Sequence, residues 1–332
     1  MKSECILVIG ANGQIGSVLV EYLREIYGVE KVIASDIRLP EHQVLPHRVP
    51  LHRVPPHETG LFEKLDATDG NALAALVKKY RVTQIYHLAA ILSAKGEQEP
   101  LKTWHINMQT YFNVLEAARE NQVAKVFYPS SIAVFGDNVD TKAEQWSYLD
   151  PATVYGISKA AGENWSNYYF QRYGMDIRSL RYPGIIGYQS MPGGGTTDYA
   201  VDIYHKAVQG EAFECFLEAG TTLPMIYISD AMDATVRLME APKDKISVRT
   251  SYNLAGISFS PEEVAASIRK IIPDFNITYK PDFRQKIAES WPAQIDDMQA
   301  RKDWGWRPAY NLDKMTEEMI IELKKKYQSV KS

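Results

Sequence analysis

The glycine-rich segment GANGQIG, residues 10–16, constrains the fold of this chain more than any other sequence feature. It directly follows the apolar run Ile6–Ile9 and opens a stretch in which apolar residues recur at helical spacing. At such a turn the first glycine permits a tight bend, the second lets a pyrophosphate approach the backbone, and the third lets the helix pack against the strand. A glycine turn that merely joins strand to helix is the alternative. We expect a dinucleotide to contact this turn through Gly10, Asn12, Gly13, Gln14 and Ile15.

Short β-branched runs alternate with helical segments along the first half of the chain. Strands are predicted at residues 5–9, 31–35, 84–88, 125–129 and 176–181, and helices at 16–27, 72–80, 110–121 and 154–173. Parallel strands joined by right-handed helical crossovers form a doubly wound sheet. We therefore predict an α/β fold, with a doubly wound parallel Rossmann sheet over residues 1–181.

The alternation loosens after Arg181. Helices are predicted at residues 199–209, 231–240, 261–272 and 312–327, with short strands at 224–228 and 277–279. We interpret residues 182–332 as mainly a smaller carboxy-terminal lobe that binds the substrate. Residues 224–241 are expected to return to the Rossmann sheet.

A proline-rich segment between residues 39 and 58 interrupts the pattern. His42, His47, His52 and His57 recur there at intervals of five residues. Four histidines suit a metal ion, but this spacing places them on no common helical face, and no carboxylate or thiol joins them at ligand spacing. A solvated loop is the favoured interpretation, and we expect no metal.

The composition excludes several classes of partner. The 332 residues carry a formal net charge of −4, so the chain lacks the basic excess that binds nucleic acid or an anionic membrane. No apolar stretch approaches the roughly 20 residues that cross a bilayer, and the first strand begins too early for a secretory leader. Cys5 and Cys215 are too few for a disulfide framework. We expect a cytoplasmic protein that binds small ligands.

Asp36 ends the second predicted strand, about 20 residues beyond the glycines. A carboxylate at this position bonds both hydroxyls of the adenosine ribose and repels a 2′-phosphate. We therefore predict that residues 1–181 bind NAD, while the nearby Arg38 keeps NADP open as the alternative. Further cofactor contacts are expected from residues beside Asp36 and at later strand ends, namely Ile37, Asp66, Ala67, Leu88, Ala89, Ala90, Tyr182 and Ile185.

Tyr155 and Lys159 are four residues apart in a predicted helix, so both side chains emerge on one face. A lysine cation beside a phenol stabilises the phenolate and lowers its pKa. Tyr155 is then a general base in oxidation and a general acid in reduction. Lys159 can also hold the nicotinamide ribose. An ordinary surface pair is the alternative.

Ser130 and Ser131 end the fourth predicted strand, at the edge where open α/β sheets place their ligands. A serine hydroxyl there can hydrogen-bond the substrate oxygen as its proton is lost or gained. Ser131 is the predicted partner of that oxygen. A turn or helix cap is the alternative for both serines.

These motifs resemble those of the extended short-chain dehydrogenase/reductase family. The family pattern is a G-x-x-G-x-x-G turn, an SS-x-A-V-[YF]-G strand end and a Y-x-x-x-K helix, and this chain has GANGQIG, SSIAVFG and YGISK. The later segment YISDAMDATVRLMEA is similar to the family's returning strand and helix. The resemblance implies that Ser131, Tyr155 and Lys159 are catalytic, and that a homodimer forms through helices 110–121 and 154–173.

Sugar-nucleotide epimerases of the same family share these motifs. They usually carry an asparagine after LRY and an arginine before the returning strand, which clamps a diphosphate. Here LRYPGIIGY has Pro183 and Gly184, and TTLPMIYISD has Leu223, Pro224 and Met225. A bidentate cation for a nucleotide diphosphate is therefore missing. An epimerase and a catalytically idle NAD-binding regulator remain the alternatives to a dehydrogenase.

Two other segments, LSAKGE at residues 92–97 and MPGGGTTDYAVDIYHKAV at residues 191–208, are similar to those of the short-chain L-threonine 3-dehydrogenases. Backbone amides, hydroxyls and a carboxylate suit a small amino acid, and an ordinary glycine loop with a helix cap is the alternative. The resemblance implies NAD-dependent oxidation of L-threonine at C3 to 2-amino-3-oxobutyrate. The expected substrate contacts are Ser93, Ser131, Tyr155, Gly194, Thr196, Thr197 and Asp198.

Overall fold

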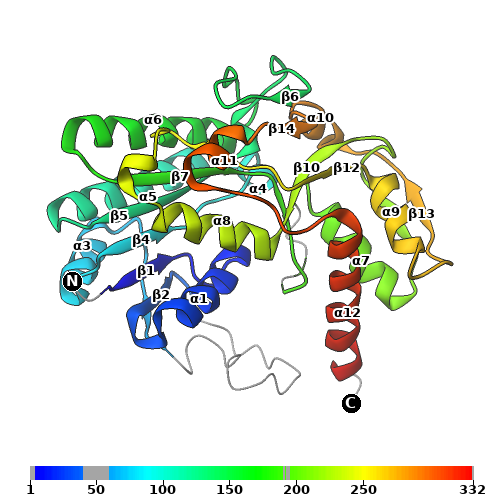
Figure 1. Ribbon diagram of the computed structural model, residues 1–332, viewed down its shortest axis with the longest axis horizontal. Helices are drawn as coiled ribbons and strands as arrows, with labels where there is room; N and C mark the ends of the chain where they lie inside the picture. Colours follow the sequence, from blue (N-terminus) through cyan, green and yellow to red (C-terminus); the bar gives the residue numbers. More distant parts are fainter. Residues whose placement is uncertain (1–3, 40–59, 190, 192–194, 331–332) are drawn as a thin grey trace.

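The computed structural model describes residues 4–39, 60–189, 191 and 195–330, and its centre is a seven-stranded sheet (Figure 1). The strand order is β11-β7-β5-β4-β1-β2-β3, and all pairs are parallel. The strands are β1 (Ile6–Ile9), β2 (Val32–Asp36), β3 (Phe62–Lys64), β4 (Gln84–His87), β5 (Lys125–Ser131), β7 (Ile177–Tyr182) and β11 (Tyr252–Asn253). The order reverses between β1 and β4, so the predicted doubly wound Rossmann fold is confirmed.

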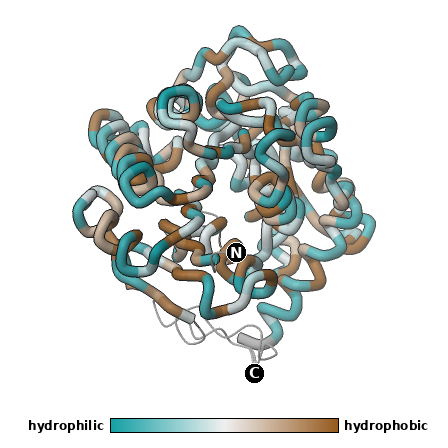
Figure 2. Tube along the Cα trace, turned by 60° about the vertical axis from the view of Figure 1, so that its left-hand side comes forward, coloured by the Kyte–Doolittle hydropathy of each residue, from teal (hydrophilic) through white to brown (hydrophobic). Residues whose placement is uncertain are grey.

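Helices cover both faces of this sheet. On one face α1 (Gln14–Tyr27) packs beside α8 (Ile228–Glu240), and on the other lie α3 (Gly70–Tyr80), α5 (Pro100–Glu120) and α6 (Val154–Tyr173). Alternate residues of β1 belong to the two separate cores, because successive side chains of a strand point to opposite faces. Burial on both faces explains why these strands are continuous apolar runs. In Figure 2 hydrophilic and hydrophobic residues alternate along the outer helices.

A second, smaller sheet begins the other lobe. Its strand order is β12-β10-β8, in which β8 (Gly184–Ile186) is parallel and β12 (Ile257–Phe259) antiparallel to β10 (Leu223–Tyr227). Beside it pack α7 (Tyr199–Gln209), α9 (Pro261–Arg269) and α12 (Leu312–Val330), as seen on the right of Figure 1.

The remaining elements are short. β13 (Ile277–Tyr279) pairs with β9 (Phe213–Cys215), and β14 (Gln294–Ile295) pairs with β6 (Lys142–Ala143). The short helices are η1 (Val29–Lys31), α4 (Ser93–Gly96), η3 (Ile132–Val134), η4 (Lys243–Lys245), α10 (Phe283–Glu289) and α11 (Met298–Trp304). Because β6 lies early in the chain and β14 late, a loop of the first half joins the second lobe.

Residues 224–241 divide between the two parts of the molecule. β10 pairs with β8 and β12, which corrects the expectation that this strand returns to the Rossmann sheet. The chain leaves that sheet at Pro183, which has no N–H to donate, and β8 then provides the parallel partner of β10. α8 does pack against α1 and β7. The domain boundary between residues 181 and 182 stays a prediction.

Among the described residues, no helix combines the length and the apolar character that crossing a membrane requires. Cys5 and Cys215 are both free thiols. His42, His47, His52 and His57 lie outside the described residues. Within the part of the chain that the structure describes, no group of three or more histidine, cysteine or acidic side chains could hold a metal ion.

Candidate active site

Five strand ends meet at the carboxyl edge of the Rossmann sheet. Because β1, β2, β4, β5 and β7 are parallel, the residues at their ends lie along the same edge. This edge carries Gly10, Asp36, Leu88, Ser131 and Tyr182. Ser131 and Tyr182 are direct neighbours in the register of β5 and β7. The fold thus places the predicted nucleotide and catalytic residues side by side.

The glycine turn after β1 leaves a backbone surface that side chains would fill. Gly10 has a φ of 86°, a left-handed conformation that favours glycine, and a Cβ there would lie 2.8 Å from the Ala89 nitrogen. A Cβ on Gly16 would lie 2.1 Å from the Gly10 carbonyl oxygen, so the close approach of α1 requires glycine. Gly13 is the N-cap of α1 and has no side chain to cover the free N–H groups of the helix. The turn therefore fits an anionic pyrophosphate.

Asp36 is held in place by a backbone N–H on each carboxylate oxygen. The Asn12 N–H donates to Oδ2 and the Arg38 N–H donates to Oδ1, both at 3.1 Å. The Asn12 side chain donates to the Arg38 carbonyl at 2.8 Å. A carboxylate has about four acceptor positions, so both oxygens can still accept from the hydroxyls of a ribose. The adjacent Ile37 is 54% exposed and offers an apolar surface to an adenine ring.

The predicted contacts after β3 lie next to Asp36. The Leu65 N–H donates to the Asp36 carbonyl at 2.9 Å, which places Asp66 and Ala67 beside the ribose position. Asp66 is exposed, and its carboxylate accepts from the N–H and the hydroxyl of Thr68. Ala67 is buried.

Residues 88–90 border the glycine turn, because the Leu88 N–H donates to the Ile9 carbonyl at 2.8 Å. The loop that follows is held by Asn107, a residue not predicted from the sequence. Its side chain accepts from the Ile91 N–H at 2.8 Å and donates to the Ile91 carbonyl at 3.0 Å. It also reaches the Ser158 hydroxyl on α6 at 3.3 Å. Asn107 thus joins the loop after β4 to α6, the helix that carries Tyr155 and Lys159.

Tyr155 lies in the first turn of α6, and the start of this helix is fixed by two caps. The Thr153 hydroxyl accepts from the Gly156 N–H at 3.1 Å, and the Glu97 carboxylate accepts from the helix's first N–H at 2.8 Å. A Cβ on Gly156 would lie 2.0 Å from the Ala133 carbonyl oxygen. Glycine at this position therefore lets the helix reach the segment that follows β5.

Burial is the largest influence on the pKa values of Tyr155 and Lys159. It raises the pKa of Tyr155 to about 12, although a hydrogen bond with the Ser131 side chain lowers that pKa. Burial also lowers the pKa of Lys159 to about 7. Lys159 Nζ donates to the Pro129 carbonyl at 2.6 Å and lies 5.5 Å from the centroid of the Tyr155 ring. The expected lowering of the Tyr155 pKa by Lys159 is therefore not found, because the ammonium is directed at a backbone oxygen.

Glu163 lies one helical turn beyond Lys159 and supports its charge. The negative charge of Glu163 raises the pKa of Lys159 against the effect of burial. The same carboxylate forms a buried ion pair with Arg181 at 2.7 Å and accepts from the Ser130 hydroxyl at 2.6 Å. Ser130 is thus engaged in the core, and Ser131 is the strand-end hydroxyl beside the phenol.

His87, at the end of β4, is a buried neutral imidazole near Lys159. Its ring stacks on Tyr111 and Tyr128, and its Nε2 lies 3.3 Å from the Thr110 hydroxyl. Its Nδ1 has no hydrogen-bond partner within the described part of the chain. Burial, together with the positive charge of Lys159, lowers the pKa of His87 to about 3.

We expect acid to destabilise the fold through His87. An unfolded histidine takes up its proton near pH 6.5, whereas folded His87 stays neutral to about pH 3. Between these values the unfolded state binds a proton that the folded state does not, so unfolding becomes easier by about 1.4 kcal/mol per pH unit. Urea unfolding measured between about pH 7 and pH 5 gives this slope. His87→Gln should reduce the slope by this amount and leave the share of His205, whose pKa burial lowers to about 4; an equal slope in both proteins would contradict the assignment.

Three of the predicted substrate residues stand together before α7. Thr196 is buried, and its hydroxyl has no hydrogen-bond partner among the residues described. The side chain of Thr197 packs on Gly184 of β8, where an added Cβ would lie 2.8 Å from the Thr197 Cβ. The Asp198 carboxylate accepts from the Gly195 N–H at 2.8 Å. β8 follows β7 directly, so this segment lies next to the end of β7, where Tyr182 pairs with Ser131.

The other predicted site residues lie in different settings. Ser93 is buried at the start of α4, which packs against α6. The Tyr182 hydroxyl is hydrogen bonded to Thr235 of α8, so this hydroxyl does not face the edge. Ile185 is half-buried on β8. Gly194 lies outside the described residues.

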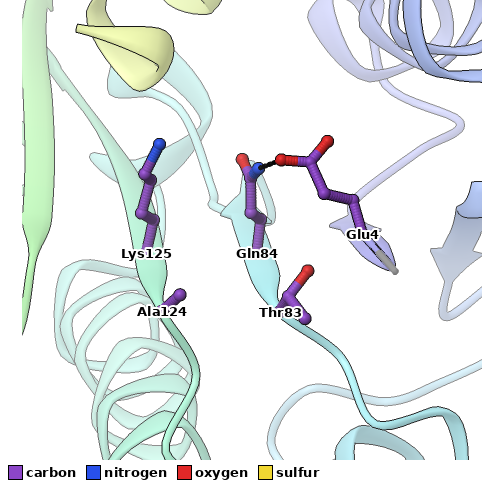
Figure 3. A pocket seen from close by; sticks show the side chains of 5 residues that line it. All are labelled: Glu4, Thr83, Gln84, Ala124 and Lys125. Atoms are coloured by element: carbon purple, nitrogen blue, oxygen red, sulfur yellow. Dashed lines mark hydrogen bonds between the residues drawn. The ribbon is translucent and has the colours of Figure 1, made fainter. Parts of the chain in front are cut away.

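A separate hollow lies at the opposite edge of the Rossmann sheet. This cavity of about 180 Å³ is lined by Glu4, Thr83, Gln84, Ala124 and Lys125 (Figure 3). Gln84 donates to Glu4 at 3.3 Å, and Lys125 donates to the carbonyl of Met239 at the end of α8 at 2.6 Å. These residues stand at the starts of β1, β4 and β5, so the hollow is distant from the carboxyl edge.

Residues 6–255 match the NAD dependent epimerase/dehydratase family, and the chain belongs to this family of NAD-dependent enzymes. The resemblance to extended short-chain dehydrogenases/reductases is thereby confirmed. A solved GalE-like L-threonine dehydrogenase from Cupriavidus necator, in its holo form, is 49% identical with a TM-score of 0.90, covering 96% of this chain and 100% of that one. A monomeric L-threonine 3-dehydrogenase from a metagenome, in its apo form, is 45% identical with a TM-score of 0.89, covering 96% and 99%. A Staphylococcus haemolyticus relative described as an uncharacterized epimerase/dehydratase is 43% identical, covering 98% of this chain and 99% of its own length.

Proposed function

We propose that this protein oxidises L-threonine at C3 to 2-amino-3-oxobutyrate, with NAD as the cofactor. The observation that carries the proposal is the packing of the Thr196–Asp198 segment on β8, beside the sheet edge that bears Ser131 and Tyr155. The similarity to solved proteins that are named L-threonine dehydrogenases supports it.

The polar groups of this segment suit a small zwitterion. The Thr196 hydroxyl is buried with no partner among the described residues, so a substrate group would satisfy it. The Asp198 carboxylate can accept a hydrogen bond from an ammonium, and the Ser93 hydroxyl can donate one to a carboxylate. Leu223 and Met225 are fully buried apolar residues at the position where an epimerase would carry its diphosphate-binding arginine. This packing argues against the alternative of a sugar-nucleotide epimerase.

In the proposed reaction, each group at the carboxyl edge of the Rossmann sheet has its own role. NAD, held by the glycine turn and Asp36, supplies the acceptor for the hydride that leaves C3 of the substrate. Tyr155, as a phenolate, takes the proton from the C3 hydroxyl while the carbon–oxygen double bond forms. Ser131 hydrogen-bonds the substrate oxygen and the phenol. Lys159, 5.5 Å from the centroid of the Tyr155 ring, can hold the nicotinamide ribose, and Glu163 raises the pKa of this lysine against the effect of burial.

Reduction of NAD by candidate substrates tests this function. NADH formation is measured with L-threonine, L-serine and UDP-galactose as the sole added substrate. The proposal expects NADH with L-threonine and little with the sugar nucleotide. Activity confined to UDP-galactose, or interconversion of the sugar without net NADH, would contradict the proposed substrate.

Ser131→Ala should slow the reaction and move its pH dependence. Removal of a hydrogen bond to the reacting oxygen typically costs about 10²-fold or more in turnover. Tyr155 must lose its proton to act as a base, so kcat/KM for oxidation rises with pH. The Ser131 bond lowers the pKa of Tyr155, so its loss should shift this rising limb to higher pH. Ser131→Thr, which keeps a hydroxyl, should restore the wild-type limb, and an unshifted limb in Ser131→Ala would contradict the assigned bond.

We also propose a homodimer formed through α5 and α6. The two helices pack side by side and expose large apolar side chains that water does not favour. These exposed residues are Leu101, Trp104, Ile157, Trp165, Tyr168 and Tyr173. A second copy of the same surface would cover them.

Light scattering should therefore give twice the mass of one chain. Tyr168→Glu places a charge in the proposed seam and should give a monomer that still binds NAD. Ile321→Glu, a change of the same kind on an exposed position of α12, is the matched control and should leave the dimer intact. A wild-type monomer, the state named for the metagenomic relative, would contradict the dimer.

A further inference from the structure

The end of α12 contacts both flanks of the proposed substrate segment. Lys326 Nζ donates to the carbonyl oxygens of Tyr188 and Gln189, at 3.3 and 3.2 Å. The hydroxyl of the next residue, Tyr327, is hydrogen bonded to His205 Nδ1 at 2.8 Å. Lys326 and Tyr327 thus tie the end of α12 both to the residues after β8 and to α7.

The two contacted sites enclose Thr196, Thr197 and Asp198. Tyr188 and Gln189 follow β8 and precede this segment. α7 begins at Tyr199, immediately after Asp198, and His205 lies about two turns further along that helix. α12 therefore contacts the residues just before this segment and also α7, the helix that follows it.

Both contacts are of kinds that hold their partners firmly in place. Lys326 is partly buried, so its ammonium bonds the two carbonyls with little competition from water, and charge-assisted bonds of this kind are stronger than neutral ones. Burial and the nearby Lys326 charge keep the pKa of His205 at about 4, so the imidazole is neutral near pH 7. The rings of His205 and Tyr327 also meet edge to face, 5.9 Å apart.

We propose that Lys326 and Tyr327 are positioning residues that set the place of Thr196 and Asp198 at the sheet edge. This inference rests on the proposed function, because the two positioned residues belong to the proposed threonine site. The residues expected to hold the pyrophosphate and the adenosine ribose lie on the glycine turn and at Asp36, whereas the hydrogen bonds of Lys326 and Tyr327 reach α7 and the residues after β8. The two residues therefore tune the binding of the amino acid and leave the binding of NAD unchanged.

Lys326→Met removes the ammonium and keeps most of the aliphatic chain. We expect the KM for L-threonine to rise by about 10-fold or more, since small misplacements of binding groups have effects of up to about 10²-fold. The KM for NAD should stay at the wild-type value. Lys326→Arg keeps a cationic donor and should restore the KM for threonine. Lys325→Met is the matched control, because Lys325 is exposed and bonds Glu322 of its own helix.

Tyr327→Phe tests the second anchor, because it keeps the ring contact and removes the hydroxyl, and it should raise the same KM. Amide hydrogen exchange supplies a reading that needs no substrate: residues 186–189 should exchange faster in Lys326→Met than in the wild type or Lys325→Met. Faster exchange with an unchanged KM for threonine would overturn the inference, as would equal rises in both KM values or a lowered melting temperature alone. A wild type that does not oxidise threonine would instead refute the proposed function, and the inference with it.

Discussion

Tyr155→Phe should lower kcat for L-threonine oxidation by about 10²- to 10⁴-fold, the usual contribution of a positioned general base. The variant keeps the ring that packs beside Lys159 and loses the hydroxyl that is bonded to Ser131. NAD binding should survive, because the glycine turn and Asp36 are untouched. Steady-state kinetics and a fluorescence titration with NADH measure the two effects separately.

Tyr168→Phe is the matched control for this experiment. Tyr168 lies on the same helix, in the surface that the proposed dimer would cover; the phenylalanine keeps the ring that packs there, so loss of the hydroxyl should leave kcat at the wild-type value. A Tyr155→Phe enzyme that turns over at more than about a tenth of the wild-type rate would show that another group transfers the proton.

Gly13→Ala should weaken NAD binding by about 100-fold, or about 2.7 kcal/mol, without unfolding the protein. Gly13 has a φ of −75°, which alanine adopts easily, and its Cβ would lie 3.3 Å from the Gly10 oxygen. The fold can accept such a contact with a shift of a few tenths of an ångström. The second glycine of the turn is, however, the one that lets the pyrophosphate reach the backbone, so a methyl group there obstructs the cofactor.

Gly16→Ala, in contrast, is expected to destabilise the fold itself. Its Cβ would lie 2.1 Å from a backbone oxygen, so α1 must move away from β1, and we expect a loss of several kcal/mol in the free energy of unfolding. Thermal melting of the two variants separates the effects. A Gly13→Ala protein that binds NADH as tightly as the wild type would contradict the proposed place of the pyrophosphate.

The elements that the sequence predicts well are those that carry their own start and stop signals. α6 spans residues 154–173 as predicted, with Thr153 capping its start and Gly174, in a left-handed conformation, ending it. α5 begins at Pro100, ten residues before its prediction, because proline suits the first turn of a helix while the apolar periodicity there is weak. β3 and β11 were not predicted, since these strands of two or three residues depend on pairing with β2 and β7.

The motifs locate the proposed catalytic groups, and contacts between residues far apart in the sequence fix the hydrogen bonds and charges around them. The Asn107 side chain donates a hydrogen bond to Ser158, 51 residues away in the sequence, and no local sequence pattern predicts this contact. The ion pair of Glu163 with Arg181 joins a helix to a strand in the same way. The hydrogen bond of Lys159 to the Pro129 carbonyl was not predicted, because a sequence motif does not reveal a backbone acceptor from a distant strand.

In the proposed reaction C3 of threonine gives up its hydrogen as hydride at the edge where Tyr155 and Ser131 meet. L-Threonine deuterated at C3 should therefore yield NADH that carries the deuterium, detected by mass spectrometry, and this transfer should be lost in Tyr155→Phe. Deuterium that stays on the amino acid, or NADH that forms without it, would contradict hydride transfer from C3.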